Sequence, residues 1–232
     1  MTCCYQTFQF LAFRVRPLYN PGMIMKNRGI VFVLILVLLA ACTPAAALDA
    51  QGRLYYDDFS SRDTRWPQSL DGLGLTDYDA GAYRIRVDEP SYYLWGLAGE
   101  DFEDVRLEVD METVTAVEGG EAGVICRFQD ADNYYFFILR PNGSYAALKM
   151  QTGELQIMYM DEDEAIQQDE AANHLSVTCA GDQLSFSVNG VQLVEITDAD
   201  FPKGDVGLIA GTNEIGGMDV HFDEFEVYPV VP

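Results

Sequence analysis

The chain has 232 residues, with 37 acidic against 14 basic side chains and a formal net charge of −23. Such acidity excludes nucleic-acid binding, which needs Lys and Arg to neutralise phosphates. A hydrophobic content of 49%, with 12% aromatic residues, excludes a disordered chain, and the length favours one domain.

The first 42 residues are predicted to be an export signal. Four basic residues and no acidic ones precede position 42, and residues 30–41 are apolar throughout. This run would rise about 18 Å as a helix, too short for a hydrocarbon core of about 30 Å, and a basic segment before such a run is typical of a signal peptide. The run ends in Leu39-Ala40-Ala41-Cys42, which resembles the bacterial lipobox and implies lipidation of Cys42. The alternative is an ordinary cleaved signal that happens to contain this cysteine.

Residues 1–22 fit neither kind of signal, and a misassigned start codon, with Met23 or Met25 as the true start, accounts for them.

The mature chain is expected to begin with a short linker. Beyond the signal, residues 43–52 are mostly small, which indicates a linker. The mature part keeps ten basic side chains against all 37 acidic ones, a charge of −27. We expect an extracytoplasmic domain of the cell envelope that contacts the membrane through its lipid anchor alone.

Residues 53–230 are predicted to form a β domain. Apolar and polar residues alternate strictly over 83–87 and 105–112, which is typical of strands with one buried face. Further strands are expected at 122–128, 133–140, 144–150, 154–159, 174–180, 183–188, 191–196, 205–210 and 218–228. Two Asn-Gly pairs, at 142–143 and 189–190, indicate hairpins with type I′ turns, which need positive φ at both positions. These features favour an antiparallel sandwich.

Three segments carry further information about the sheets. Residues 56–59 and 222–225 are similar, and in both the alternation breaks at an acidic pair, which indicates a bulge or bend. Pairing of these two end strands would bring the ends of the domain together. Residues 133–139, NYYFFIL, are apolar on both faces, so this strand is either central and covered on both sides or has one face lining an aromatic cleft.

Two cysteines remain in the exported part. Cys126 and Cys179 both lie in apolar, strand-like runs. An even number of cysteines in an exported chain is expected to pair, and a disulfide closing a loop of this length would contribute about 3–4 kcal/mol. The alternative is two buried free thiols, which pack as small apolar side chains.

Several segments, in order along the chain, resemble a known superfamily. They include GAYRIRV, FEDVRLEVDM, AGVICRFQDADNYYFFILRPNGSY and FDEFEVYP. The resemblance is to concanavalin A-like lectins and glucanases, in particular to laminin-G-like and 3-keto-disaccharide-hydrolase-type (domain of unknown function 1080) jelly rolls on bacterial lipoproteins. It covers about residues 53–230 and implies an all-β, antiparallel two-sheet jelly roll. Its motifs determine the fold and are not catalytic signatures, so they say little about activity.

One motif could carry catalysis. Glu108, Asp110 and Glu112 lie at alternate positions, so their side chains share one face of a strand. Retaining β-glucanases of the superfamily carry a similar E-x-D-x-E motif, which implies Glu108 as nucleophile, Glu112 as acid/base and Asp110 as the residue that tunes their pKa values. A solvated strand face gives the same pattern without catalysis, because Arg106 continues the polar stripe.

Aromatic residues are candidates for stacking on sugar rings, because an aromatic face packs on apolar C–H surface. Tyr92 and Tyr93 are adjacent in a strand-like segment, so one of the two rings is expected to be exposed. For every member of the set, burial in the core is the alternative. The candidates for glycan binding are Trp66, Tyr92, Tyr93, Trp95 and Tyr134.

No cofactor is expected, and a structural calcium ion is the one metal that remains a candidate. Some members of the superfamily hold a structural Ca²⁺ near the C-terminal strand, which implies Asp57 and Asp223 as the carboxylates to test. Transition-metal catalysis is disfavoured, because the only histidines, His174 and His221, lie far apart in the sequence.

The sequence therefore predicts a lipid-anchored jelly-roll domain that serves, without catalysis, as a glycan-binding or surface-interaction module. One alternative is a glycoside hydrolase, either of the 3-keto-disaccharide type or β-glucanase-like with Glu108 and Glu112. The other is a structural protein whose partner is a second envelope protein.

Overall fold

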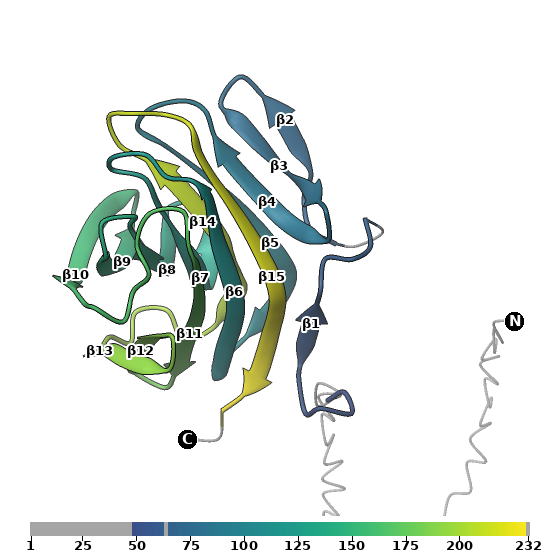
Figure 1. The fold of residues 1–232 in the computed structure, drawn as a ribbon. Coiled ribbons are helices and arrows are strands. Elements are labelled where there is room, and N and C mark those ends of the chain that lie inside the picture. The colour runs from purple at the N-terminus through teal and green to yellow at the C-terminus, as the bar shows by residue number, and fades with distance from the viewer. Residues whose placement is uncertain (1–47, 63–64, 231–232) are drawn as a thin grey trace, which may run out of the picture. The chain divides into compact units, whose positions relative to one another are not determined.

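The structure is a computed structural model that describes residues 48–62 and 65–230 (Figure 1). These ranges contain fifteen strands and no helix, so within them no segment could cross a membrane as a helix. The predicted signal, with Cys42, lies outside the described residues. All strand pairs are antiparallel, and two sheets pack face to face, which confirms the predicted sandwich.

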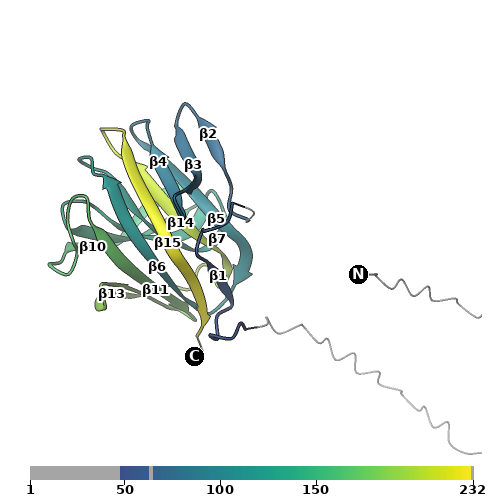
Figure 2. The ribbon, with the colours of Figure 1, turned by 45° about the vertical axis from the view of Figure 1, so that its right-hand side comes forward.

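The nine-stranded sheet has β15 near its centre, between β6 and β4 (Figure 2). Its strands in spatial order are β13 (Val191–Thr197), β12 (Gln183–Val188), β11 (Ala172–Ala180), β6 (Val105–Thr115), β15 (Met218–Pro229), β4 (Ala82–Val87), β3 (Gly74–Asp79) and β2 (Ser69–Asp71), with β1 (Tyr55–Asp57) also on β15. The six-stranded sheet runs β10 (Glu154–Glu162), β9 (Ser144–Gln151), β8 (Asn133–Leu139), β7 (Glu121–Asp130), β14 (Gly204–Thr212) and β5 (Tyr92–Phe102).

The main core lies between the two sheets. In β6 the alternation is as predicted, since Val105, Leu107, Val109 and Met111 are all at most 2% exposed. Trp66 is also only 2% exposed, so the expectation that it binds a glycan is wrong. The physical reason is that its indole has aromatic neighbours on several sides and its Nε1–H donates a hydrogen bond to the Tyr55 hydroxyl at 2.9 Å.

The two end strands pair, as the sequence predicts. In the register of β1 and β15, Tyr55 lies opposite Val227 and Asp57 opposite Phe225. The predicted irregularity is present as well, because the β15–β6 register shifts between Asp223 and Glu226. Asp57 accepts a hydrogen bond from the backbone N–H of Phe59 at 2.8 Å, where the chain leaves the strand. These end strands thus join the first and last parts of the domain in one sheet.

Both Asn-Gly hairpins form, but with different turns. At Asn189 and Gly190, φ is 50° and 82°, as a type I′ turn requires. Between β8 and β9 only Gly143 has positive φ, at 86°, and its N–H donates to the Arg140 carbonyl at 3.0 Å. The type I′ expectation is wrong there, because Pro141 fixes a negative φ at the second turn position and favours a type I turn ending in glycine.

A disulfide joins the two sheets. Cys126 on β7 bonds to Cys179 on β11, with Cα atoms 6.9 Å apart and both side chains fully buried. Next to it, Arg127 is 1% exposed and donates to the carbonyls of Gly181 at 2.8 Å and Phe201 at 3.0 Å. The disulfide and this guanidinium therefore connect β7 to segments that are distant in the sequence.

Candidate functional site

A second apolar cluster lies on the outer face of the six-stranded sheet. On β8, Tyr135 and Phe137 point into the main core, whereas Tyr134, Phe136 and Ile138 belong to the second cluster. The strand that is apolar on both sides therefore lies inside its sheet, with one face in the main core and the other in this aromatic cluster. We call this surface the aromatic face; its residues are Ile125, Tyr134, Phe136, Ile138, Ala146, Leu148 and Ile209, with Tyr93, Trp95, Leu97, Phe128 and Met150 partly buried around them.

Aromatic rings fix one another's positions on this face. Trp95 lies 6.4 Å from both Phe128 and Tyr134, measured between ring centroids, and Phe128 lies 5.3 Å from Tyr134. Tyr93 packs against Phe136 with centroids 6.1 Å apart and an interplanar angle of 80°. Because Tyr93, Trp95 and Phe128 are only half-buried, part of each ring reaches solvent. The arrangement offers a preformed surface for stacking.

Three of the predicted glycan-binding residues thus meet in one cluster, where Tyr93 and Trp95 are partly exposed and Tyr134, only 3% exposed, is buried. Tyr93 and Trp95 come from β5 and Tyr134 from β8, which β14 and β7 separate within the sheet. Tyr92 is 38% exposed but is not part of the cluster. Phe128 and Phe136 are not among the predicted glycan-binding residues, although NYYFFIL contains Phe136 and its two-sided apolarity is a signal for this face.

A polar group ends the aromatic face at the turn between β8 and β9. Glu121 is 2% exposed, and Arg140 Nε and Nη2 each lie 2.8 Å from its Oε2. The Tyr93 hydroxyl donates a hydrogen bond to the same carboxylate. Burial raises the pKa of Glu121, and the charge of Arg140 and its hydrogen bonds oppose that rise. These three residues come from β7, β5 and the end of β8, so only the folded sheet brings them together.

A cavity of about 540 Å³ adjoins this polar group. Arg140 contributes to its wall together with Asn142 and Asn213, and the remaining wall comes from Ala116, Val117, Glu118, Gly119, Pro141 and Asp169. Amide and carboxylate groups of this kind can exchange hydrogen bonds with hydroxyl groups. The six-stranded sheet therefore combines a ring-lined surface with a polar cavity at one end.

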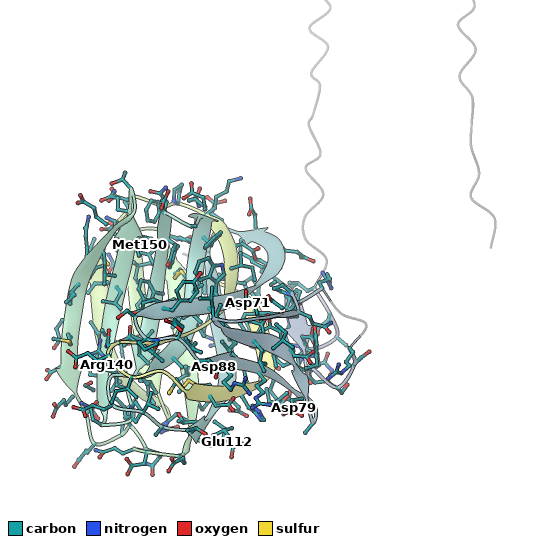
Figure 3. All side chains as sticks on the ribbon, turned by 90° about the horizontal axis from the view of Figure 1, so that it is seen from above. Asp71, Asp79, Asp88, Glu112, Arg140 and Met150 are labelled. Atoms are coloured by element: carbon teal, nitrogen blue, oxygen red, sulfur yellow. A yellow bond between two sulfur atoms is a disulfide. The ribbon has the colours of Figure 1, made fainter. Side chains whose placement is uncertain are left out.

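The predicted catalytic motif lies on the outer face of the other sheet. Glu108 forms an ion pair with Arg106 at 3.0 Å, and Asp110 lies 2.7 Å from Nδ1 of His174. Asp110 and Glu112 line a second cavity of about 540 Å³, but Glu108 does not. The predicted nucleophile and acid/base therefore do not share a cavity. Figure 3 labels Glu112 and Asp79, which both line this second cavity.

The two histidines lie on the same cavity, although the sequence separates them. His174 is on β11 and His221 is on β15, and these strands pair with opposite edges of β6. Their separation in the sequence therefore does not keep them apart in space. No Phe, Tyr or Trp side chain from the described part of the chain lines this cavity. Its carboxylates and imidazoles suit proton transfer better than ring stacking.

The two aspartates considered for calcium point to opposite faces of their sheet. Asp57 is 8% exposed and lies opposite the buried Phe225, whereas Asp223 lies opposite Asp110 and lines the second cavity. Burial raises the pKa of both carboxyl groups. Within residues 48–62 and 65–230, no three His, Cys, Asp or Glu side chains are grouped so that they could hold a metal ion. Asp57 and Asp223 therefore do not form the expected calcium pair.

Comparison with solved structures finds the same fold in several proteins. The carbohydrate-binding module CBM66 from Bacillus subtilis is 15% identical, with a TM-score of 0.54 over 75% of this chain and 94% of that one. A galectin-like protein of unknown function from Bacillus subtilis has a TM-score of 0.60 at 15% identity, covering 78% and 97%. The β-glucanase of Bacillus licheniformis has a TM-score of 0.58 at 10% identity, covering 78% and 100%. At these identities the likeness establishes the fold alone, which confirms the expected jelly roll.

Sequence comparison places the chain in a family. No curated protein matches it. The pattern of one domain family, however, matches residues 83–227, which is more than half of the chain and runs from β4 into β15. The chain belongs to the family of 3-keto-alpha-glucoside-1,2-lyase-like domains.

Proposed function

We propose that this chain is a non-catalytic carbohydrate-binding domain that holds a polysaccharide on the aromatic face. One observation carries the proposal, namely a sheet surface on which the partly exposed Trp95 and Phe128 pack around the buried Tyr134 and which a hydrogen-bonded polar group ends. Sugar rings present apolar C–H surfaces that pack on aromatic faces, while their hydroxyl groups need polar partners. The aromatic face and the adjoining cavity offer both.

The chemistry of the aromatic face supports binding without hydrolysis. Glycoside hydrolysis uses a pair of carboxyl groups on either side of the scissile bond. Among the residues that form the aromatic face and its polar end, Glu121 is the one carboxylate, and it is already engaged by Arg140 and Tyr93. The similar fold of the carbohydrate-binding module CBM66 fits the same interpretation.

The test is binding to a panel of polysaccharides, measured by calorimetry with the purified chain. We expect Trp95→Ala to weaken binding about threefold to tenfold, which corresponds to one stacked ring. Glu112→Gln, on the opposite sheet, is the matched control and should leave the affinity unchanged. Unaltered binding by Trp95→Ala, or loss of binding in Glu112→Gln, would count against the aromatic face.

A second candidate function is the elimination that the family's name describes. Its supporting observation is His174, whose Nδ1 lies 2.7 Å from an Asp110 carboxylate oxygen at the wall of the second cavity. A carboxylate that orients an imidazole is a common arrangement for a general base. In a 3-keto glucoside the ketone acidifies the hydrogen on C2. The imidazole would take that proton, a C1=C2 double bond would form, and the C1–O bond would break with its electron pair leaving on oxygen, which is then protonated.

Incubation with a 3-keto glucoside separates the two candidates, because elimination produces a conjugated enone that absorbs in the ultraviolet. Enone formation that is lost in His174→Asn and retained in Trp95→Ala would establish the lyase in place of the binding domain. No enone, together with polysaccharide binding that depends on Trp95, would establish the binding domain.

We further infer that the chain is exported and anchored by a lipid on Cys42. The support is the basic segment, the apolar run at 30–41 and the lipobox-like end, followed by the linker at 43–52. Cys42→Ser should move the protein from the membrane fraction to the soluble fraction of the envelope. A wild-type protein that is already soluble would favour an ordinary cleaved signal.

A further inference from the structure

The domain carries far more acidic than basic side chains, and most of the basic ones are paired. The described residues carry ten basic side chains and 36 acidic ones. All the basic side chains except that of Lys203 form an ion pair with a carboxylate within this part of the chain. A negatively charged ligand therefore meets a surface whose positive groups are almost all neutralised.

At the polar end of the aromatic face the positive charge is likewise neutralised by a carboxylate. Arg140 is the cationic side chain there, and Nε and Nη2 of its guanidinium both contact the buried Glu121. A ligand carboxylate that took this guanidinium would leave Glu121 buried without its counter-charge, which is a costly state. The pair can serve hydroxyl groups through its remaining hydrogen-bonding capacity, but it offers no free positive charge.

Carboxylates also flank the aromatic face at two other places. Asp130 and Asp132 are exposed at the turn between β7 and β8, and Glu162 is exposed at the end of β10. In the β10–β9 register Glu162 lies opposite Ser144, which shares its sheet face with Ala146 and Leu148 of the aromatic face. Lys203, just before β14, is a single positive charge and does not offset the negative charge of these three carboxylates.

We propose that the aromatic face accepts uncharged polysaccharides and rejects those that carry carboxylate, sulfate or phosphate groups. This inference rests on the proposed function and names the ligand class of the same site. Acidic polysaccharides are disfavoured for two reasons. The net negative charge of the domain repels them at long range, and locally Arg140 is not free to bind their acidic groups because it is paired with Glu121. The long-range repulsion is screened by salt, whereas the buried pair is screened much less.

The experiment compares polysaccharides of similar backbone that differ in charge, such as hydroxyethyl cellulose with carboxymethyl cellulose, and mannan with mannuronan. Binding is measured at about 0.15 M and 1 M salt, where the screening length is about 8 Å and 3 Å. We expect the neutral polymer of a pair to bind with little dependence on salt, and the acidic polymer to bind at least about tenfold more weakly at both salt concentrations.

Glu121→Gln is the decisive variant, because it keeps the size of the side chain and releases the charge of Arg140. It should raise the affinity for the acidic polymer, relative to the neutral one of the pair, about tenfold. Glu118→Gln is the matched control, since Glu118 is exposed on the wall of the adjoining cavity and forms no ion pair with Arg140. Glu118→Gln removes one negative charge, as Glu121→Gln does, but leaves Arg140 paired with Glu121. It should therefore not change the preference for the neutral polymer over the acidic one.

The outcomes distinguish this inference from the proposed function. If no polysaccharide binds, neutral or acidic, the proposed function fails. If acidic polymers bind the wild-type chain as well as neutral ones, the proposed function stands and the inference is overturned. An equal gain in Glu118→Gln and Glu121→Gln would overturn the role of the buried pair. The wild-type comparison decides the preference even if Glu121→Gln does not fold.

Discussion

Replacing one tryptophan at a time should separate the core from the binding surface. The chain contains two tryptophans, Trp66 in the main core and Trp95 on the aromatic face. In Trp66→Phe all indole fluorescence comes from Trp95, and in Trp95→Phe all of it comes from Trp66. We expect glycan binding to change the emission of the first variant and to leave the emission of the second unchanged.

The free energy of unfolding that Trp66→Phe is expected to lose can be estimated from the contacts of Trp66. The indole lies 5.3 Å from Phe59 and 5.1 Å from both Tyr83 and Phe225, measured between ring centroids, and it donates one hydrogen bond to Tyr55. Losing the hydrogen bond costs about 1 kcal/mol, and the smaller ring leaves a void that costs about 1–2 kcal/mol. The sum, about 2–3 kcal/mol, should lower Tm by about 4–12 °C in a domain of this size.

The assay is a fluorescence titration with the polysaccharide found in the panel, combined with thermal unfolding. Trp66→Phe should bind with the wild-type affinity despite its lower Tm, because the core ring does not reach the ligand. The reasoning is refuted if glycan changes the emission of Trp66 in the Trp95→Phe variant. It is equally refuted if Trp66→Phe loses its affinity at a temperature at which it remains folded.

Three further predictions concern stability and are measured by denaturant unfolding. Replacing Cys126 and Cys179 together by alanine should lower the free energy of unfolding by about 4 kcal/mol, with reducing agent destabilising the wild type but not the variant. Arg127→Met should cost about 3–5 kcal/mol, because it leaves buried carbonyls without their donor, and a cost below 1 kcal/mol would contradict this. Burial, together with the charges of Glu224 and Asp110, raises the pKa of Asp223. The folded state therefore binds a proton on this carboxyl group more tightly than the unfolded chain does. As a result, the free energy of unfolding of the wild type rises as pH falls through the folded pKa. Asp223→Asn should therefore be more stable than wild type at pH 7, by less than about 1 kcal/mol, with no difference below the ordinary value of 3.8; a difference that persists there would contradict the assignment.

Most strands could be predicted from local patterns. The alternation over 105–112 and the Asn-Gly turns depend only on neighbouring residues, so both are visible in the sequence. Of strand β5 the sequence pattern indicates only the start, at Tyr92 and Tyr93, because Gly96 and Gly99 interrupt the apolar run that follows. Gly96 is required by packing, since a side chain there would overlap the ring of Tyr83 from the other sheet. That requirement comes from a long-range contact.

The candidate site was predicted only in part, because its composition depends on strand order. Tyr93 and Trp95 were recognised as aromatic, yet Trp66 looked equally suitable and is buried in the core. Glu121 and Arg140 carried no signal at all, since their pairing requires β7 and β8 to be neighbours in register.

The sequence by itself determined the acidity of the domain, its β character and the hairpins, because charge, period-2 alternation and turn residues are local properties. Only the tertiary structure decided which apolar face remains open to solvent and which residues meet there. Alternation assigns a residue to one side of its strand but does not say what covers that side. The order of strands in the two sheets covers Trp66, exposes part of Trp95 and brings His174 and His221 to one cavity.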